Sequence, residues 1–495
     1  MRKLLILIIA ALVWSANAQT LTIAISEGMP GFDPTQTTRT VANDVYPNIF
    51  DGLLALDREG QIVPSLALSW DVVNEKDWHL TLRQGVKWHD GETFDAEDVK
   101  FTLERLATNK DLIRHVLMTE LESVEIVNPY EVVLHMANPD PLLPVNLTMP
   151  ATAMLPAHYF EAVGVDKFTQ APIGTGPYKF AEYRPDDRLV LTVNEDYWAG
   201  KAAFSELVFR VITESTTSVS ELITGGVAVS DIGPNDLERV ESSGVAHVTT
   251  QATNRVVHWT LNVSEGQATA DKRVREALDL AIDNQVFIDV LENGYGTPTR
   301  VRTGPGDNFM PTKYYGTYNY DPDRARELLA EAGYGPGELT IAIMGASSVS
   351  DRAELTAAML EAVGIVPDIQ LFESSVWTSK YWTPGEFTNM AGVGSSNSAM
   401  DYGSTLSDLQ CPEGAHSQRS HWCNEEFSDL VRAANRELDT AKRAELLDAA
   451  TEILVDELPQ LYLYNSVGFI GVSNKLDWSP RPDGSLLMFD ARPAN

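Results

Sequence analysis

The alternation of hydrophobic and polar residues predicts strands in the first third of the chain. Residues 21–25 (LTIAI), 78–83 (WHLTLR) and 131–136 (EVVLHM) repeat with a period of two, which is typical of strands with one buried face. Asp95 precedes a segment whose apolar residues have helical spacing. A helix is therefore expected after Asp95, with this residue as its N-cap.

From about residue 270, helices are expected to alternate with short strands. The spacing of apolar residues predicts one long helix over 271–291, and Asp321-Pro322 predicts the start of another. Further strands are expected at 339–344, 369–372, 461–464 and 468–472, and further helices at 351–363, 425–437 and 441–456. This alternation indicates an α/β fold in which helices cover a sheet.

The N-terminus is typical of a secretory signal peptide. Arg2 and Lys3 precede an apolar run over residues 4–14, and the small residues Ala16 and Ala18 then provide a cleavage site after Ala18. The run is too short for a membrane-spanning helix, which needs about 20 residues. We therefore expect residues 1–18 to be removed on export to the periplasm.

The chain has two cysteines, Cys411 and Cys423, in a polar segment. An exported protein occupies an oxidising compartment, so a local disulfide is the favoured interpretation. Two free thiols are one alternative. A metal site formed with His416 and His421 is another, although paired CxxC spacing is missing.

Charge excludes some partners without identifying a ligand. The 495 residues include 37 Lys and Arg against 70 Asp and Glu, which gives a formal net charge of −33. Such a surface repels nucleic acid and anionic lipid. The 44% hydrophobic content argues against disorder. A saline habitat would explain the acidity as well as any function would.

Motifs of catalysis are missing from the sequence. It contains no GxSxG elbow, no HExxH and no GxxxxGK[ST] loop, and Gly174-Thr175-Gly176 lacks the third glycine of a dinucleotide fingerprint. We therefore expect no enzymatic activity and no cofactor. A periplasmic hydrolase with a triad assembled from distant residues stays an alternative.

Several segments, in order along the chain, resemble landmarks of one family. They are 62–70 (IVPSLALSW), 78–106 (WHLTLRQGVKWHDGETFDAEDVKFTLERL), 174–178 (GTGPY), 194–198 (NEDYW), 274–283 and 320–333. On these residues the chain resembles the extracellular solute-binding proteins of family 5, the periplasmic receptors of ABC importers. His89-Asp90 in the second segment also suggests a metal or acid–base pair, but a turn before the helix is the favoured interpretation.

The resemblance implies a two-lobed periplasmic-binding-protein type II fold with an extra inserted domain, as in cluster C. The implied domains are a signal peptide (1–18), lobe I (19–48, 171–265 and 468–495), the inserted domain (49–170) and lobe II (266–467). It further implies a monomer that captures a peptide in an interlobe cleft by hinge closure and delivers it to permease subunits in the inner membrane. A polar oligosaccharide, another charged nutrient, or a nickel or haem chelate is the alternative ligand.

The resemblance also implies ligand-binding residues in lobe II. Asp401 matches the family's anchor for a peptide ammonium, Trp377 matches a tryptophan of the pocket wall, and Arg352 lies near the arginine that takes the carboxylate. The structural alternatives are an Asp401 that caps a turn, a Trp377 in the core and a solvated Arg352. The other implied ligand-binding residues are Tyr402, Ser398 and Gln418.

Two departures from the family pattern bear on the ligand. Residues 394–399 are Gly, Ser, Asn and Ala in place of bulky aromatic residues. Gln418 replaces an asparagine of the cysteine loop. The first change suits a more polar or a larger ligand, and both changes argue against a strict dipeptide assignment.

Overall fold

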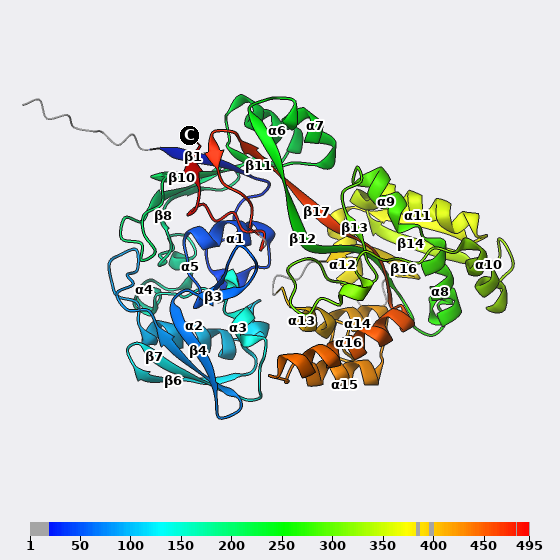
Figure 1. Cartoon of the computed structure of the whole chain (residues 1–495), viewed down its shortest axis with the longest axis horizontal. Helices are drawn as coiled ribbons and strands as arrows, with labels where there is room; N and C mark the ends of the chain where they lie inside the picture. Colours follow the sequence, from blue (N-terminus) through cyan, green and yellow to red (C-terminus); the bar gives the residue numbers. More distant parts are fainter. Residues whose placement is uncertain (1–18, 383–386, 396–399, 482, 495) are drawn as a thin grey trace, which may run out of the picture.

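Two long strands join two lobes in the computed structural model, which describes residues 19–382, 387–395, 400–481 and 483–494. These strands are β12 (Ala246–Leu261) and β17 (Gln460–Ser473), which pair antiparallel and run side by side from one lobe to the other (Figure 1). The predicted signal peptide and Ser398 lie outside the described residues. The two strands predicted at 461–464 and 468–472 both lie within β17, which continues between them because the chain stays extended where it passes between the lobes.

One continuous sheet runs through both lobes, in the order β15-β14-β16-β12-β17-β11-β1-β10-β9-β8, with β13 also paired to β17. The lobe I strands are β1 (Thr20–Ile25), β8 (Tyr178–Arg184), β9 (Arg188–Val193), β10 (Glu206–Val211) and β11 (Val229–Asp231). The lobe II strands are β13 (Thr297–Pro298), β14 (Thr340–Ala346), β15 (Val366–Phe372) and β16 (Met390–Ser395). Each lobe buries its own hydrophobic core against this sheet.

The strand register shows that the parallel strands of the two lobes end toward each other. β17 runs from lobe II into lobe I, and β11 pairs with it antiparallel, with Asp231 opposite Ile470; β1 and β10 are parallel to β11. β12 runs the other way, and β16 pairs with it antiparallel, with Ser395 opposite Val256; β14 and β15 are parallel to β16. We call the side of each lobe at which these strands end its interlobe face.

Helices cover the sheet in both lobes. Those of lobe I are α1 (Thr40–Val45), α6 (Ser215–Thr224) and α7 (Leu237–Glu241); those of lobe II are α8 (Lys272–Ala281), α9 (Asn284–Leu291), α10 (Pro322–Glu331), α11 (Ser350–Ala362), α12 (Ser374–Trp382), α13 (Tyr402–Ser407), α14 (Ala415–Ser420), α15 (Glu425–Ala434) and α16 (Thr440–Glu457). The cap predicted at Asp321 is confirmed. The single helix predicted over 271–291 is two helices, because the Asp283 side chain accepts from the Gln285 N–H and starts α9.

A separate four-stranded sheet lies within residues 67–136. It comprises β4 (Ala67–Val73), β5 (Asp77–Leu82), β7 (Glu131–Met136) and β6 (Leu121–Asn128), in the order β4-β5-β7-β6, covered by α2 (Ala96–Thr108). A short hairpin, β2 (Leu54–Leu56) and β3 (Ile62–Pro64), precedes it. The predicted N-cap is confirmed: Asp95 accepts from the Glu97 N–H, and Asp98 completes a capping box.

The family-like motifs meet where this sheet's domain joins lobe I. The imidazole Nδ1 of His89 accepts from the Gly174 N–H at 3.1 Å, and Nε2 lies 3.0 Å from the Gly176 carbonyl oxygen. A Cβ on Gly174 would lie 2.0 Å from the carbonyl oxygen of Ile49, so only glycine fits. These contacts give His89 a structural role at the junction.

The same junction buries the carboxylate of Asp51. It accepts from the Thr175 hydroxyl at 2.8 Å, the Tyr197 hydroxyl at 3.0 Å and the Trp198 indole N–H at 2.9 Å. Burial raises the pKa of Asp51, and these three hydrogen bonds oppose that rise. The segments 174–178 and 194–198 therefore hold the chain at Asp51, just before the hairpin of β2 and β3.

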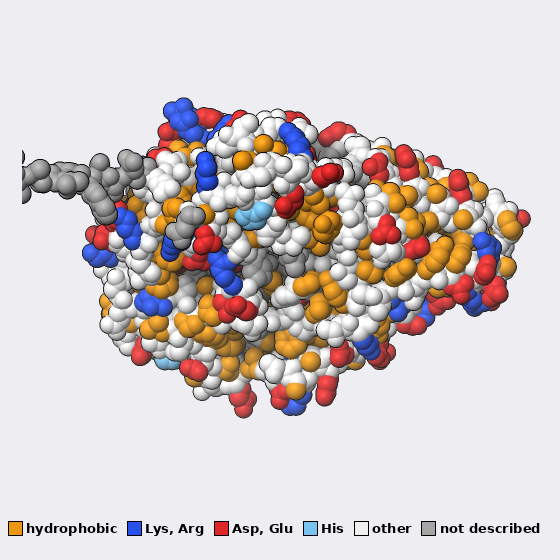
Figure 2. All heavy atoms as spheres, turned by 45° about the horizontal axis from the view of Figure 1, so that its top comes forward, with side chains coloured by type: hydrophobic (Ala, Val, Ile, Leu, Met, Phe, Trp, Pro, Cys, Tyr) orange, Lys and Arg blue, Asp and Glu red, His pale blue; other side chains and the backbone are white. Residues whose placement is uncertain are grey.

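The face of the molecule drawn in Figure 2 carries acidic side chains over both lobes, with basic side chains among them. Among the described residues, every helix is too short or too polar to cross a membrane.

Candidate functional site between the lobes

The interlobe face of lobe II is formed by the ends of β14 and β16 and by the starts of α11 and α12. Figure 1 shows α12 and α13 on the side of lobe II that faces lobe I. In open α/β sheets, ligands bind outside the carboxyl ends of parallel strands. Since the strands of both lobes end toward each other, the space between the two interlobe faces is the candidate site.

Two arginines lie together on the interlobe face of lobe II. Arg352, in the first turn of α11, donates to the Val393 carbonyl at 3.2 Å, and its guanidinium lies 5.7 Å from the Trp259 ring centre. Burial lowers the pKa of Arg352; Tyr464 and Glu292 raise it, and Arg255 lowers it. Arg352 is therefore a desolvated cation next to a second cation.

Arg255 lies in the irregular part of β12, between Ala252 and Val256, where the strand passes from one lobe to the other. Its exposed guanidinium lies over the backbone of Gly394, since a Cβ at Gly394 would stand 2.8 Å from Nη2. Neither Arg255 nor Arg352 forms an ion pair with a carboxylate in the described part of the chain. The nearby Glu292 instead accepts from the Tyr464 hydroxyl at 2.7 Å.

Acidic groups lie on the interlobe face of lobe I. Asp231 ends β11 and lines a pocket of about 110 Å³ with Ser26, Thr213 and Ser215. Burial raises the pKa of Asp44 in α1 well above its usual range, and the carboxylates of Asp231, Glu27 and Asp483 raise it further. Burial also raises the pKa of Asp231, although its side chain stays exposed, which is the situation of a group at the mouth of a pocket.

Asp401 lies in lobe II, and both oxygens of its carboxylate accept hydrogen bonds. Both oxygens accept from the guanidinium of Arg443 in α16 at 2.7 Å, and Oδ1 also accepts from the Ser404 N–H at 3.1 Å as the N-cap of α13. The side chain is 2% exposed. This arrangement corresponds to the structural alternative, a capping Asp; an ammonium-binding role for Asp401 stays a prediction.

The other predicted ligand-binding residues lie apart from one another. Tyr402 is fully buried, with its hydroxyl 3.1 Å from that of Thr451. Trp377 packs in an aromatic cluster, stacked on Phe372 with ring centres 6.2 Å apart. Gln418 is exposed and donates to backbone carbonyls of its own loop. Ser398 lies outside the described residues.

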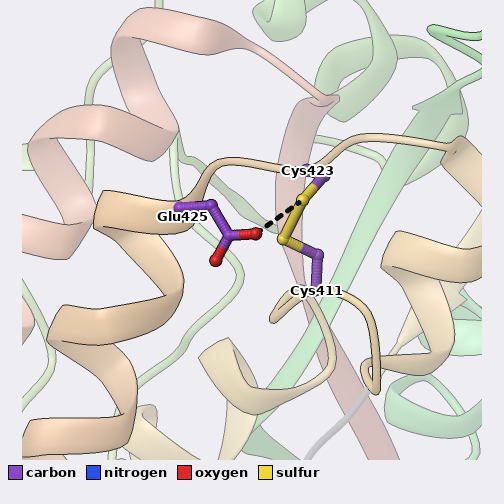
Figure 3. Close-up of side chains that lie close together, drawn as sticks. All are labelled: Cys411, Cys423 and Glu425. Carbon is purple, nitrogen blue, oxygen red and sulfur yellow. Dashed lines mark hydrogen bonds between the residues drawn. A yellow bond between two sulfur atoms is a disulfide. The ribbon is translucent and has the colours of Figure 1, made fainter.

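The two cysteines form the predicted disulfide, with their Cα atoms 5.2 Å apart (Figure 3). Glu425 points toward it, with Oε1 3.9 Å from Cys423 Sγ. Because both sulfurs are bonded to each other, they are not thiolate ligands for a metal. His421, at the end of α14, is exposed.

His416, inside the disulfide loop, is buried in lobe II. Its Nδ1 lies 3.0 Å from the Tyr381 hydroxyl and 3.4 Å from the Gln460 side-chain nitrogen. Burial lowers the pKa of His416 well below its usual value, as do the cations Arg302 and Arg419. A nickel site built from His416 and His421 finds no support in this geometry.

Two larger cavities lie within lobe I and the adjoining domain. One, of about 290 Å³, lies between residues 43–56, 148–153 and the tail 481–490. The other, of about 650 Å³, lies between residues 29–37 and 180–185. Neither includes a residue from the interlobe face of lobe II.

Sequence reasoning missed Arg255, Asp44, Asp231 and Arg443. Asp231 had a usable sign, since it follows a short apolar stretch and precedes Gly233-Pro234, as a residue at a strand end does. Arg255 and Arg443 had none, because their positions depend on how distant segments pack.

Comparisons with known proteins agree with this architecture. The model of the bacterial extracellular solute-binding proteins, family 5 (Middle), matches residues 61–411. Di/tripeptide-binding protein 1 of Pseudomonas aeruginosa (strain UCBPP-PA14) is 30% identical over 480 residues, covering 88% of this chain and 87% of that protein.

Two solved structures share the fold. The periplasmic binding protein DppA from Helicobacter pylori, in complex with the peptide STSA, matches with a TM-score of 0.80 and 24% identity over 96% of this chain and 98% of that one. NikA from Brucella suis, in complex with Fe(III)-EDTA, matches with a TM-score of 0.86 and 22% identity over 96% and 99%. They confirm the predicted two-lobed, type II architecture.

Proposed function

Because the chain belongs to the bacterial extracellular solute-binding proteins of family 5, we propose that it is the periplasmic receptor of an ABC importer and that its ligand is a short peptide. The match to the family model and the similarity to a protein named as a di/tripeptide-binding protein support the class of receptor. The ligand is inferred from the charges on the two interlobe faces.

The observation that carries the proposal is the opposite sign of these charges. Lobe I presents Asp44 and Asp231, and lobe II presents Arg352 and Arg255. A peptide carries an ammonium at one end and a carboxylate at the other, and a closed site desolvates both, so each needs a fixed partner of opposite sign. In this proposal the ammonium is held by lobe I and the carboxylate by Arg352.

Asp401 has a positioning role in this proposal. Its bidentate pair with Arg443 ties the start of α13 to α16, and the Arg443 guanidinium lies 4.5 Å from the centre of the Phe309 ring. A buried carboxylate that already pairs with a guanidinium gains little from a second cation. Its contribution is to fix the start of α13.

Hinge closure is the proposed mechanism of capture. The β12–β17 register is irregular between Ala252 and Val256, where the strands pass from one lobe to the other. A hydrogen bond also links the two lobes, because the Asn293 side chain of lobe II donates to the Pro234 carbonyl of lobe I at 2.9 Å. A ligand with contacts on both faces would favour the closed state, which the permease subunits would recognise.

A thermal-shift screen of the mature chain tests the proposal. The probes are Ala-Ala, a tripeptide, a pentapeptide, maltose and a nickel–histidine chelate. A bound ligand raises the melting temperature with concentration. We expect at least one peptide to do so; a shift with maltose or the chelate and none with peptides would overturn the peptide assignment.

A further inference from the structure

Two neighbouring arginines, Arg255 and Arg352, lack an ion pair with a carboxylate in the described part of the chain. It has 70 acidic residues for 37 basic ones, and many of its arginines pair with carboxylates on the surface. Arg255 and Arg352 form no ion pair among the described residues, yet Arg255 lowers the pKa of Arg352 from close by. Like charges held together without a counterion favour the binding of an anion.

The two arginines differ in their setting. Arg352 is half-buried and donates from Nη1 to the Val393 carbonyl, close to the end of β16. Arg255 is exposed, and the absence of a side chain at Gly394 lets its guanidinium lie against the backbone near the end of β16. Arg352 is therefore the inner, more buried guanidinium, and Arg255 is the outer, more exposed one.

The Glu292 carboxylate, which acts on Arg352, already accepts a hydrogen bond. Among the described residues, the acidic group that acts on Arg352 is Glu292, whose carboxylate accepts from the Tyr464 hydroxyl at 2.7 Å. It offsets part of the positive charge without pairing with either guanidinium. One peptide carboxylate at Arg352 would leave the outer guanidinium, Arg255, without a partner.

We propose that Arg255 determines specificity by binding a second carboxylate, so that this receptor prefers peptides with an acidic residue beside the C-terminal carboxylate. The inference rests on the proposed function, because it assumes a peptide whose C-terminus lies at Arg352. It adds a class of ligand, dicarboxylate peptides, and names the residue that selects it.

Calorimetric titration with Ala-Glu and Ala-Gln tests the proposal, since the two dipeptides have nearly the same shape and differ in one charge. A hydrogen-bonded charge pair is worth about 1.5 kcal/mol or more, so we expect Ala-Glu to bind about tenfold more tightly. The preference should weaken at high salt, because an exposed guanidinium is screened. Equal affinities for the two dipeptides would overturn the proposal.

The variant Arg255→Met should remove the preference while Ala-Gln binds as before, and Arg255→Lys should keep part of it. Arg326→Met, which removes a surface arginine paired with Asp323 on α10, is the matched control and should leave both affinities unchanged. Equal weakening of Ala-Glu and Ala-Gln by Arg255→Met would mean that both arginines hold one carboxylate, which contradicts the proposal. If neither peptide binds the wild-type chain, the proposed function fails, and this inference with it.

Discussion

Arg443 binds both oxygens of the Asp401 carboxylate, with 2.7 Å between the atoms of each pair. The two side chains are 3% and 2% exposed, so water screens the pair very little. The pair joins α16 to the N-cap of α13 through two residues that are 42 positions apart in the sequence. It therefore fixes the start of α13 against α16.

Removing one partner of this pair should destabilise the protein strongly. Asp401→Asn leaves a buried guanidinium without its counterion, so we expect the free energy of unfolding to fall by about 3–5 kcal/mol. The double variant Asp401→Asn/Arg443→Met should lose less than the sum of the single variants. Urea denaturation measures all three.

The exposed pair Arg326–Asp323 is the control for this cycle. Asp323→Asn should change the unfolding free energy by less than about 1 kcal/mol. If Asp401→Asn were as mild as Asp323→Asn and instead abolished peptide binding, Asp401 would be a ligand anchor and not a positioning residue.

The disulfide should contribute to the stability of lobe II. Cys411→Ser/Cys423→Ser releases a loop that contains α14, with the buried His416 and Arg419. A crosslink over a loop of this size is worth about 3 kcal/mol in the chain-entropy model. We expect a lower melting temperature for the variant and for the reduced wild type; no change in either would show that the loop is held by its other contacts.

Stability should fall in acid partly because of His89. Burial lowers the pKa of His89 to about 4, from an ordinary value of 6.5. Between these values the unfolded chain binds a proton that the folded chain does not, so this contribution is complete above pH 6.5 and is lost as the pH falls toward 4. The loss is at most about 3 kcal/mol.

His89→Gln isolates this effect from the titration of the many carboxylates. The variant should have a smaller slope of unfolding free energy against pH between about 4 and 6.5, whatever its stability at neutral pH. Identical slopes for variant and wild type would mean that His89 titrates as it does in the unfolded chain.

Local patterns predicted the elements that local interactions determine. Asp95 and Asp321 predict the starts of their helices because a capping side chain accepts a hydrogen bond from a backbone N–H two or three residues away. Asp283 is a capping residue of the same kind, but it lies within a long apolar pattern that predicts one continuous helix. The passage of β17 through both lobes had no local sign, because its extended conformation depends on pairing with β12 and β11.

The candidate site was harder to predict than the fold. Asp401 has the sequence context of a ligand anchor, but its nearest cation is Arg443 on a distant helix. The resemblance predicted Arg352. The position of the Arg255 guanidinium depends on how β12 packs against Gly394 of β16, which the sequence alone does not show. Charges that act across an interlobe space are set by tertiary packing, which the spacing of residues does not reveal.

The central claim is that a peptide is held between the acids of lobe I and Arg352 of lobe II. Calorimetric titration of Ala-Ala into the wild-type chain, Asp231→Asn and Arg352→Met tests it most directly. We predict one-to-one binding to the wild type and a loss of about tenfold or more in affinity for each variant, with little change in melting temperature without ligand. Binding that is absent from the wild type, or unchanged in both variants, would contradict the account.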